Sequence, residues 1–363
     1  MMQNTCSTSR LNLRGAVAIL LVFYISSSGI FGFAYGLGPE GWLAQLMGLL
    51  MAAPLLLILA RLLHILPGRT LYDMLDHLFG RWIACFLSLL YFFYFISLAA
   101  TVRVQYAELI RLVTLVHTPL VVILLAFFIL CVYLAKSGLE TLGKWSLFLG
   151  ALAIAFTLGL TLMATPHMRG EHLLPMGVQA PAALIRGGGK FAIFPLGEAV
   201  VMLALLGRLD KGASPYKLLF TGALLAAGFF LLTFFRDTAI LGATLMDMVH
   251  YPSFKAAGVV QLGWIGGRVD MFFAGILLLT GLTKAAVCLI AASGALGRVF
   301  SLPDGNAVLI PVAFFSVGLS AILFPNLAQL FAHPSVYVYY APLFQAVIPG
   351  LMWLAAEWKN WGR

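Results

Sequence analysis

One acidic side chain stands inside a stretch that is apolar enough to cross a bilayer. Glu198 follows Pro195 and Gly197, and the apolar residues 199–206 come directly after it. Proline and glycine weaken a helix, and a charge near the middle of a membrane costs at least about 2.5 kcal/mol. Backbone that leaves a helix inside a membrane is tolerated only where protein covers it or where it lines a cavity. The stretch therefore predicts a broken membrane helix beside a polar site.

The carboxylate of Glu198 has several possible roles. It could bind the ammonium group of an amino acid, hold a proton or attract a cation, whereas a purely structural glutamate would be satisfied by neighbouring hydroxyl or backbone groups. Lys284 is a possible charged neighbour, fourteen residues after Asp270 and thus about 21 Å further along a helix. Its ammonium could take the place of a coupling cation and hold the membrane segment of Lys284 to the first membrane segment without sodium. Alternatively, the long side chain could extend to the inner membrane surface.

A second interruption falls in the first apolar run. Ser26, Ser27, Ser28 and Gly29 are small, and their side chains or flexibility compete with helical backbone bonding. Helix ends at this point and at Leu196–Gly197 would offer free N–H groups to a carboxylate and free C=O groups to an ammonium. The pattern matches the two ends of a small amino acid. The alternative is that these small residues only let helices pack closely.

The composition indicates an integral membrane protein. Of the 363 residues, 62% are hydrophobic and only 10% are charged, against roughly 25% charged in soluble domains. The apolar runs are about twenty residues long and do not alternate, which excludes a β-barrel. The net charge of +9 is typical of basic cytoplasmic loops, so no nucleic-acid partner is expected. The scattered cysteines and histidines predict no metal site, and no nucleotide loop or catalytic triad can be assembled, so we expect neither a cofactor nor an enzyme.

Ten apolar segments organise the chain as one transmembrane permease-like domain over residues 1–363. They are Gly15–Tyr35, Trp42–Leu66, Trp82–Thr101, Pro119–Leu134, Leu147–Ala164, Phe191–Leu206, Leu218–Phe235, Met271–Ala292, Ala307–Phe324 and Val336–Ala355. An even number places both termini on one side, and the distribution of basic residues favours the cytoplasm. The breaks fall in segments one and six, the first positions of two five-helix halves, which predicts an inverted five-plus-five repeat around a binding site.

Two longer loops lie on the outer side. The first, Thr165–Lys190, carries Gly187–Gly189, which we interpret as a flexible approach to the sixth segment. The second, Arg236–Arg268, contains a short helix near Tyr251–Ala256 that serves either as a lid or as a plain connector. Arg103 and Glu108, at the outer end of the third segment, could pair with each other or contact a partner, and we expect a solvated pair.

Several short motifs resemble those of one known family. They are Gly68-Arg69-Thr70-Leu71, Phe79-Gly80, Thr118-Pro119, Gly138-Leu139-Glu140, Leu173-Leu174-Pro175, Gly197-Glu198, Tyr251-Pro252-Ser253-Phe254, Arg268-Val269-Asp270 and Thr283-Lys284. Their order and spacing resemble the B subunit of nutrient germinant receptors of bacterial endospores. That permease-like family lies within the amino acid-polyamine-organocation superfamily, which shares the leucine-transporter fold.

The resemblance implies an all-α bundle that binds a small nutrient, an amino acid above all, between broken segments one and six. It implies partner A and C subunits, membrane lipid around the bundle, and a place in the spore inner membrane. An autonomous proton-coupled amino acid permease is the alternative. Tyr91 and Tyr94 lie on the third segment, which flanks the pocket in this fold, and either face the site or pack ordinarily. The candidate ligand-binding residues are Ser26, Ser27, Ser28, Gly29, Tyr91, Tyr94, Phe194, Leu196, Gly197, Glu198 and Thr283, and the candidate ion or proton site is Glu198 with Lys284.

Overall fold

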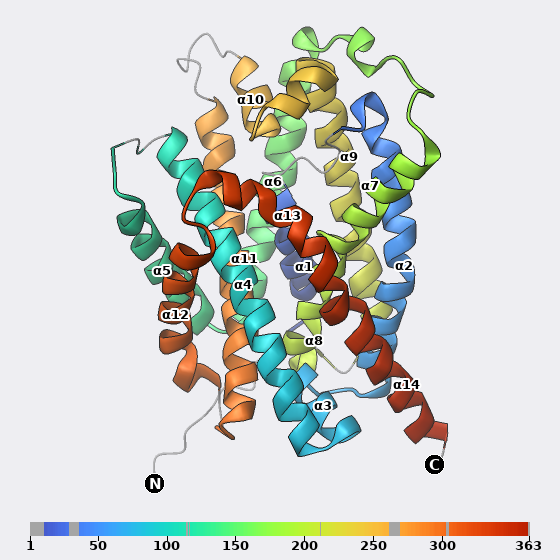
Figure 1. The fold of residues 1–363 in the computed structure, drawn as a ribbon, viewed down its shortest axis with the longest axis vertical. Coiled ribbons are helices and arrows are strands. Elements are labelled where there is room, and N and C mark those ends of the chain that lie inside the picture. The colour runs from blue at the N-terminus through green and yellow to red at the C-terminus, as the bar shows by residue number, and fades with distance from the viewer. Residues whose placement is uncertain are drawn as a thin grey trace.

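The computed structural model describes residues 11–28, 36–113, 115, 117–210, 212–260, 269–302 and 305–361, and this part of the chain is almost entirely helical (Figure 1). Within it, the only extended pairing is an isolated bridge between Leu11 and Leu209. The helices are α1 (Leu13–Ser28), α2 (Gly41–Ile65), α3 (Leu71–Phe79), α4 (Arg81–Val113), α5 (Leu120–Lys136), α6 (Leu139–Ala164), α7 (Pro181–Ile193), α8 (Val201–Leu205), α9 (Pro215–Met248), α10 (Pro252–Val259), α11 (Val269–Val299), α12 (Leu309–Leu323), α13 (Leu327–Pro342) and α14 (Ile348–Trp361).

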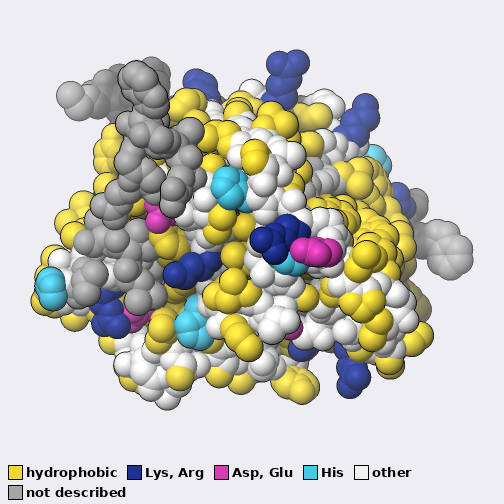
Figure 2. Space-filling model, turned by 90° about the horizontal axis from the view of Figure 1, so that it is seen from above, with side chains coloured by type: hydrophobic (Ala, Val, Ile, Leu, Met, Phe, Trp, Pro, Cys, Tyr) yellow, Lys and Arg dark blue, Asp and Glu magenta, His cyan; other side chains and the backbone are white. Residues whose placement is uncertain are grey.

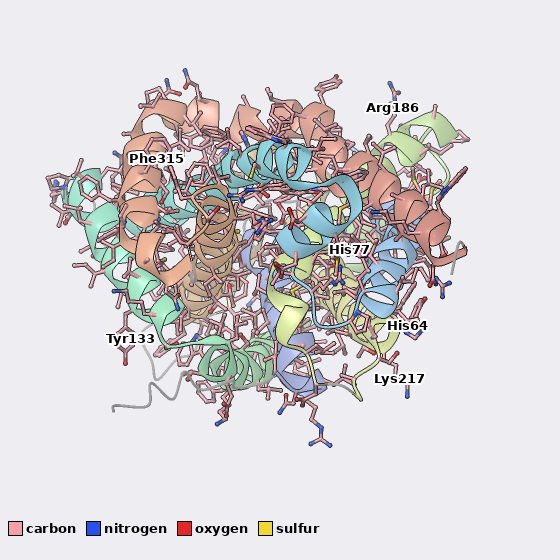
Figure 3. All side chains as sticks on the ribbon, turned by 90° about the horizontal axis from the view of Figure 1, so that it is seen from below. His64, His77, Tyr133, Arg186, Lys217 and Phe315 are labelled. Atoms are coloured by element: carbon pink, nitrogen blue, oxygen red, sulfur yellow. The ribbon has the colours of Figure 1, made fainter. Side chains whose placement is uncertain are left out.

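The helices have the lengths that a membrane requires. In the described part, eight helical stretches are long and apolar enough to cross a bilayer, and two shorter apolar helices, Leu13–Ser26 and Leu120–Lys136, lie at the predicted first and fourth segments. Large apolar side chains are exposed on the sides of the bundle, among them Ile322 and Tyr133, which points outward in Figure 3. The protein is therefore an integral membrane protein, and the count of ten spans stays a prediction.

The most buried helix is α1, which lies in the middle of the bundle in Figure 1. It packs against α6, α9 and α11, and its residues from Ile19 to Ile25 are all at most 5% exposed. A helix that is apolar on every side belongs in the interior, because no face of it prefers water. Helix α11, which contacts α1, also packs along α4.

The glycine run Gly187–Gly189 is helical, which corrects the prediction of a flexible approach. It lies in α7, and α7 packs closely on α2. A Cβ on Gly187 would lie 2.5 Å from Cδ1 of Leu37, and one on Gly188 would lie 3.0 Å from Cβ of Met47. These glycines are thus explained by the close approach of two membrane helices, as small residues commonly are.

The predicted seventh segment is also longer than expected, because Arg236 and Asp237 lie inside α9 rather than in a loop. Both are buried, and Nη2 of Arg236 lies 2.6 Å from Oδ1 of Asp237, so the two charges neutralise each other. Ser253, at the start of α10, donates to the other carboxylate oxygen of Asp237. The short helix predicted near Tyr251 is therefore present as α10 and is fixed to α9.

Helix α9 is kinked, and a backbone carbonyl freed near the kink binds the loop that precedes α7. Gly242 has a φ of 74°, and the helical hydrogen-bonding pattern breaks there. The carbonyl of Ala239 instead accepts from the backbone N–H of Arg169, at 2.9 Å, and lies 2.9 Å from Nδ1 of His172. Seen from this upper end, Lys, Arg and His side chains lie among hydrophobic ones (Figure 2).

Helix α3 lies across the lower end of the bundle, with His77 near the centre of that face (Figure 3). Thr70 and Asp73 form a capping box at its start. At its end, Nζ of Lys359 donates to the carbonyls of His77, at 2.7 Å, and Leu78, at 3.1 Å. A cation suits the free carbonyls of a helix C-terminus, so the last helix of the chain is tied to this short one.

Candidate functional site

The sixth membrane segment is broken at the predicted place. Helix α7 ends at Ile193, Phe194 is extended, and the 3-10 turn η4 (Leu196–Val200) leads into α8. Pro195 has no N–H to donate and cannot continue α7, while Gly197 leaves room for a neighbouring helix. A Cβ on Gly197 would lie 2.2 Å from Oε1 of Gln345. Glu198 is thereby held on an irregular turn in the middle of the bundle.

Glu198 forms an ion pair with Lys284 of α11. The distance from Nζ to Oε2 is 2.5 Å, and neither side chain has any exposed surface. The lysine therefore does not reach the inner membrane surface, and its ion pair joins its segment to the sixth. Contact with α1 is made through the ring of Phe23, whose centroid lies 4.5 Å from Nζ, and the ring of Phe194 lies at 5.4 Å. Two aromatic rings thus help to stabilise the buried ammonium.

A network of polar groups continues from the other carboxylate oxygen. The hydroxyl of Tyr337 donates to Oε1 of Glu198 at 3.1 Å, and the hydroxyls of Tyr94 and Tyr337 lie 2.9 Å apart. Nε2 of Gln345, in the π turn η7 (Leu343–Val347), donates to Tyr94 at 2.9 Å and to Tyr337 at 2.8 Å. Tyr94 can therefore donate to Tyr337, which donates to the carboxylate, and the side chains that contact Glu198 by hydrogen bonds in the described part of the chain are donors. Such surroundings stabilise a charged carboxylate.

A small cavity adjoins the ion pair. The space open to the centre of a water molecule is about 20 Å³, which is room for about one water. Its lining residues are Leu98, Thr101, Val102, Gln105, Phe194, Glu198, Lys284, His333, Pro334 and Tyr337. An amino acid is larger than this space, so a ligand of that size fits beside Glu198 only if the lining residues move apart.

The structure brings several of the predicted ligand-binding residues to this centre. Phe194, Gly197 and Glu198 belong to the break itself, and Tyr94 is joined to Glu198 through Tyr337. The carbonyl of Leu196 accepts from the hydroxyl of Tyr24 of α1 at 3.2 Å, which links the two segments that were expected to enclose a ligand.

Other predicted residues lie elsewhere. Tyr91 donates to the carbonyl of Phe344 at 2.8 Å, and Thr283 accepts from Nε1 of Trp145 at 3.2 Å, so neither hydroxyl contacts the ion pair. Ser26 is buried in the last turns of α1, where its carbonyl accepts from Tyr106 at 2.7 Å. That helix continues through Ser27 and Ser28, and Gly29 lies outside the described residues.

Arg103 and Glu108 do not form the expected solvated pair. Arg103 is fully buried and donates from Nη1 to Ser316 at 2.6 Å, whereas Glu108 pairs with Arg111 at 3.0 Å. Helix α4 continues to Val113, well beyond the predicted end at Thr101, and this places both residues inside the packed bundle.

Sequence reasoning missed three members of the centre, Tyr337, Gln345 and Phe23. The first two are polar residues of the tenth segment, Val336–Ala355, which also contains Pro342. Prolines beside polar groups inside an apolar run are the same signal that drew attention to Glu198. Nothing in the local sequence distinguishes Phe23 from the other apolar residues of α1.

The arrangement of helices around a central polar break is that of a known membrane-protein fold. The structure is similar to that of Mhp1, a nucleobase-cation-symport-1 family transporter with bromovinylhydantoin bound, with a TM-score of 0.70 over 95% of this chain and 78% of that chain at 15% identity. It is also similar to a Na⁺-coupled sialic acid symporter, with a TM-score of 0.52 over 95% of this chain and 85% of that chain at 14% identity. The chain therefore has the leucine-transporter fold.

Comparison of the sequence with known families narrows this further. Residues 13–326 match the model of the spore germination protein family, and the chain belongs to this family. Spore germination protein KB of Bacillus subtilis is 20% identical over 360 residues, covering 97% of this chain and 96% of that protein. Spore germination protein YndE of the same organism is 22% identical over 338 residues, covering 89% of each. Family and structural relatives alike are transporter-like proteins rather than enzymes.

Proposed function

We propose that this protein is a germinant receptor subunit that binds a small nutrient, an amino acid or a close relative, at the Glu198–Lys284 centre. The observation that carries the proposal is the fully buried ion pair at the break of the sixth segment. Ionisable groups inside a membrane are costly and are commonly retained for function. Membership of the spore germination protein family supports the biological role.

The centre has the connections that a sensor needs. Glu198 on η4 contacts Lys284 on α11 and Tyr337 on α13, and Leu196 contacts Tyr24 on α1. A ligand that enters here changes contacts among four elements at once. It shifts the bundle between two states only as far as it binds one of them better.

The signal would then pass to partner A and C subunits in the spore inner membrane, with both termini of this chain in the cytoplasm. The lower end of the bundle supports such a role, because α3 joins α14 through Lys359 and joins α11 through the ion pair of Asp76 with Arg298. A movement of α11 at Lys284 can therefore reach this end of the molecule.

A second candidate function is an autonomous proton-coupled amino acid permease. The structural relatives are transporters, and in the described part of the chain the ammonium of Lys284 lies against the carboxylate where a mobile cation would otherwise be needed. Uptake of labelled amino acids by the purified protein alone in vesicles separates the two functions. Accumulation inside the vesicles supports the permease, and its absence together with ligand binding supports the sensor.

Binding is tested by thermal unfolding of the purified protein in detergent with each of the twenty standard amino acids. We expect at least one to raise the unfolding temperature of the wild type and not that of Glu198→Gln. Glu140→Gln is the matched control, because Glu140 forms an exposed pair with Lys144 at 2.8 Å. In spores, Glu198→Gln should abolish the nutrient response and Glu140→Gln should preserve it. An unchanged response of Glu198→Gln would show that the nutrient binds elsewhere.

A further inference from the structure

Among the described residues, the charges of the central site add to zero. Among the residues that line the small cavity, Glu198 is the acidic and Lys284 the long basic side chain, and the two form an ion pair. His333 is the one other titratable group besides tyrosine in that lining. The site is thus a neutral ion pair surrounded by rings, hydroxyls and amides.

A neutral pair inside a membrane restricts what can join it. A ligand with a net charge would leave one unit of charge uncompensated in a region of low polarity, and such a charge is strongly unfavourable. A zwitterion adds an ammonium and a carboxylate together, so the total stays at zero. Each of its charged groups also finds a partner already present.

We infer that a small zwitterion binds by entering between Glu198 and Lys284. Its ammonium takes the place of Nζ at Oε2 of Glu198, and its carboxylate accepts from Nζ of Lys284, so that one ion pair becomes two. This inference rests on the proposed function and specifies how the ligand is recognised.

The contacts of the two charged residues suit this exchange. Glu198 remains held through Oε1 by Tyr337 while Oε2 is released to the ligand. The ammonium of Lys284 remains beside the ring of Phe23, at 4.5 Å. The ring of Phe194 and the side chain of Val102 border the cavity and leave little space, which favours a ligand with a short side chain.

The exchange of ion-pair partners would also couple ligand binding to a movement of η4 away from α11. The direct contact of 2.5 Å between η4 and α11 must open by the width of the inserted charged groups. A ligand that carries only one of the two groups could not replace both halves of the pair. Separation of η4 from α11 would therefore respond to zwitterions and not to simple acids or amines.

The first test compares each amino acid that stabilises the wild type with the two compounds that lack its amino or its carboxyl group. For L-alanine these are propionate and ethylamine, and affinities are taken from ligand-dependent unfolding temperatures. We expect both to bind at least about tenfold more weakly than alanine, the loss typical of one charged hydrogen-bonded contact. Equal binding of either compound and alanine would overturn the inference.

The second test changes the charge of the site. Glu198→Gln leaves a net positive site and should prefer propionate to alanine, whereas Lys284→Gln leaves a net negative site and should prefer ethylamine. Glu140→Gln should keep the wild-type order. If the two site variants bind alanine but keep the wild-type order, the ligand does not enter between the pair. If neither variant folds, the comparison on the wild type decides the matter.

Ligand binding and the mode of ligand entry give different results in these tests. A wild type that no amino acid stabilises contradicts the proposed function itself. A wild type that is stabilised by alanine and equally by ethylamine keeps the proposed function and refutes only the insertion between Glu198 and Lys284.

Discussion

Breaking the buried ion pair from one side should destabilise the protein far more than removing both charges. Glu198→Gln leaves Lys284 as a buried cation without its carboxylate, and Lys284→Met leaves the carboxylate without its ammonium. Removing one partner of a buried pair typically costs about 3–5 kcal/mol, whereas replacing both with groups of similar volume is often neutral. Neither side chain of this pair has exposed surface, so we expect a cost within that range.

The double variant Glu198→Gln with Lys284→Met should therefore unfold close to the wild-type temperature, and each single variant well below it. Glutamine can still accept from Tyr337, and methionine retains most of the lysine stem beside Phe23. Apparent unfolding temperatures of the purified proteins in one detergent provide the measurement. Glu140→Gln removes an exposed pair and should cost no more than about 1 kcal/mol. A double variant as unstable as the two single changes combined would refute the reasoning.

Two other predictions concern packing and capping. Gly281→Ala should lower the unfolding temperature, because the new Cβ would lie 2.0 Å from Cε2 of the buried Tyr106 ring, and overpacking costs about 1–3 kcal/mol. Gly275→Ala on the same helix meets no atom within 4 Å and is its control; equal temperatures for the two variants would contradict this. Thr70→Ala removes half of the capping box with Asp73 and should cost α3 about 0.5–2 kcal/mol, seen as faster hydrogen exchange over residues 71–79. Unchanged exchange there would show that tertiary contacts alone hold α3.

Sequence reasoning located the centre of the site because its signals are local. A proline, a glycine and a carboxylate in one apolar run are each unfavourable in a membrane, so their combination at Glu198 marks an irregular, covered turn. A buried charge also requires a partner, which made Lys284 a candidate neighbour. The structure joins these two residues at 2.5 Å.

Other features depend on contacts between distant segments and carry no local signal. Tyr337 reaches Glu198, and Gln345 reaches Tyr337, only because α13 and η7 lie beside the break. Arg236 and Asp237 were interpreted as the start of a loop, since charges commonly mark the ends of membrane segments. Their mutual pairing lets α9 continue instead, and only the folded structure reveals it.

The size of the cavity has a consequence for the rate of binding. If the proposed nutrient binds beside Glu198, where the free space is about 20 Å³, the walls must move before it enters. Association at this centre would therefore be set by how often the bundle opens rather than by diffusion, and its observed rate would level off as the nutrient concentration rises. Such a centre would respond little to a brief exposure to the nutrient and fully to a lasting one.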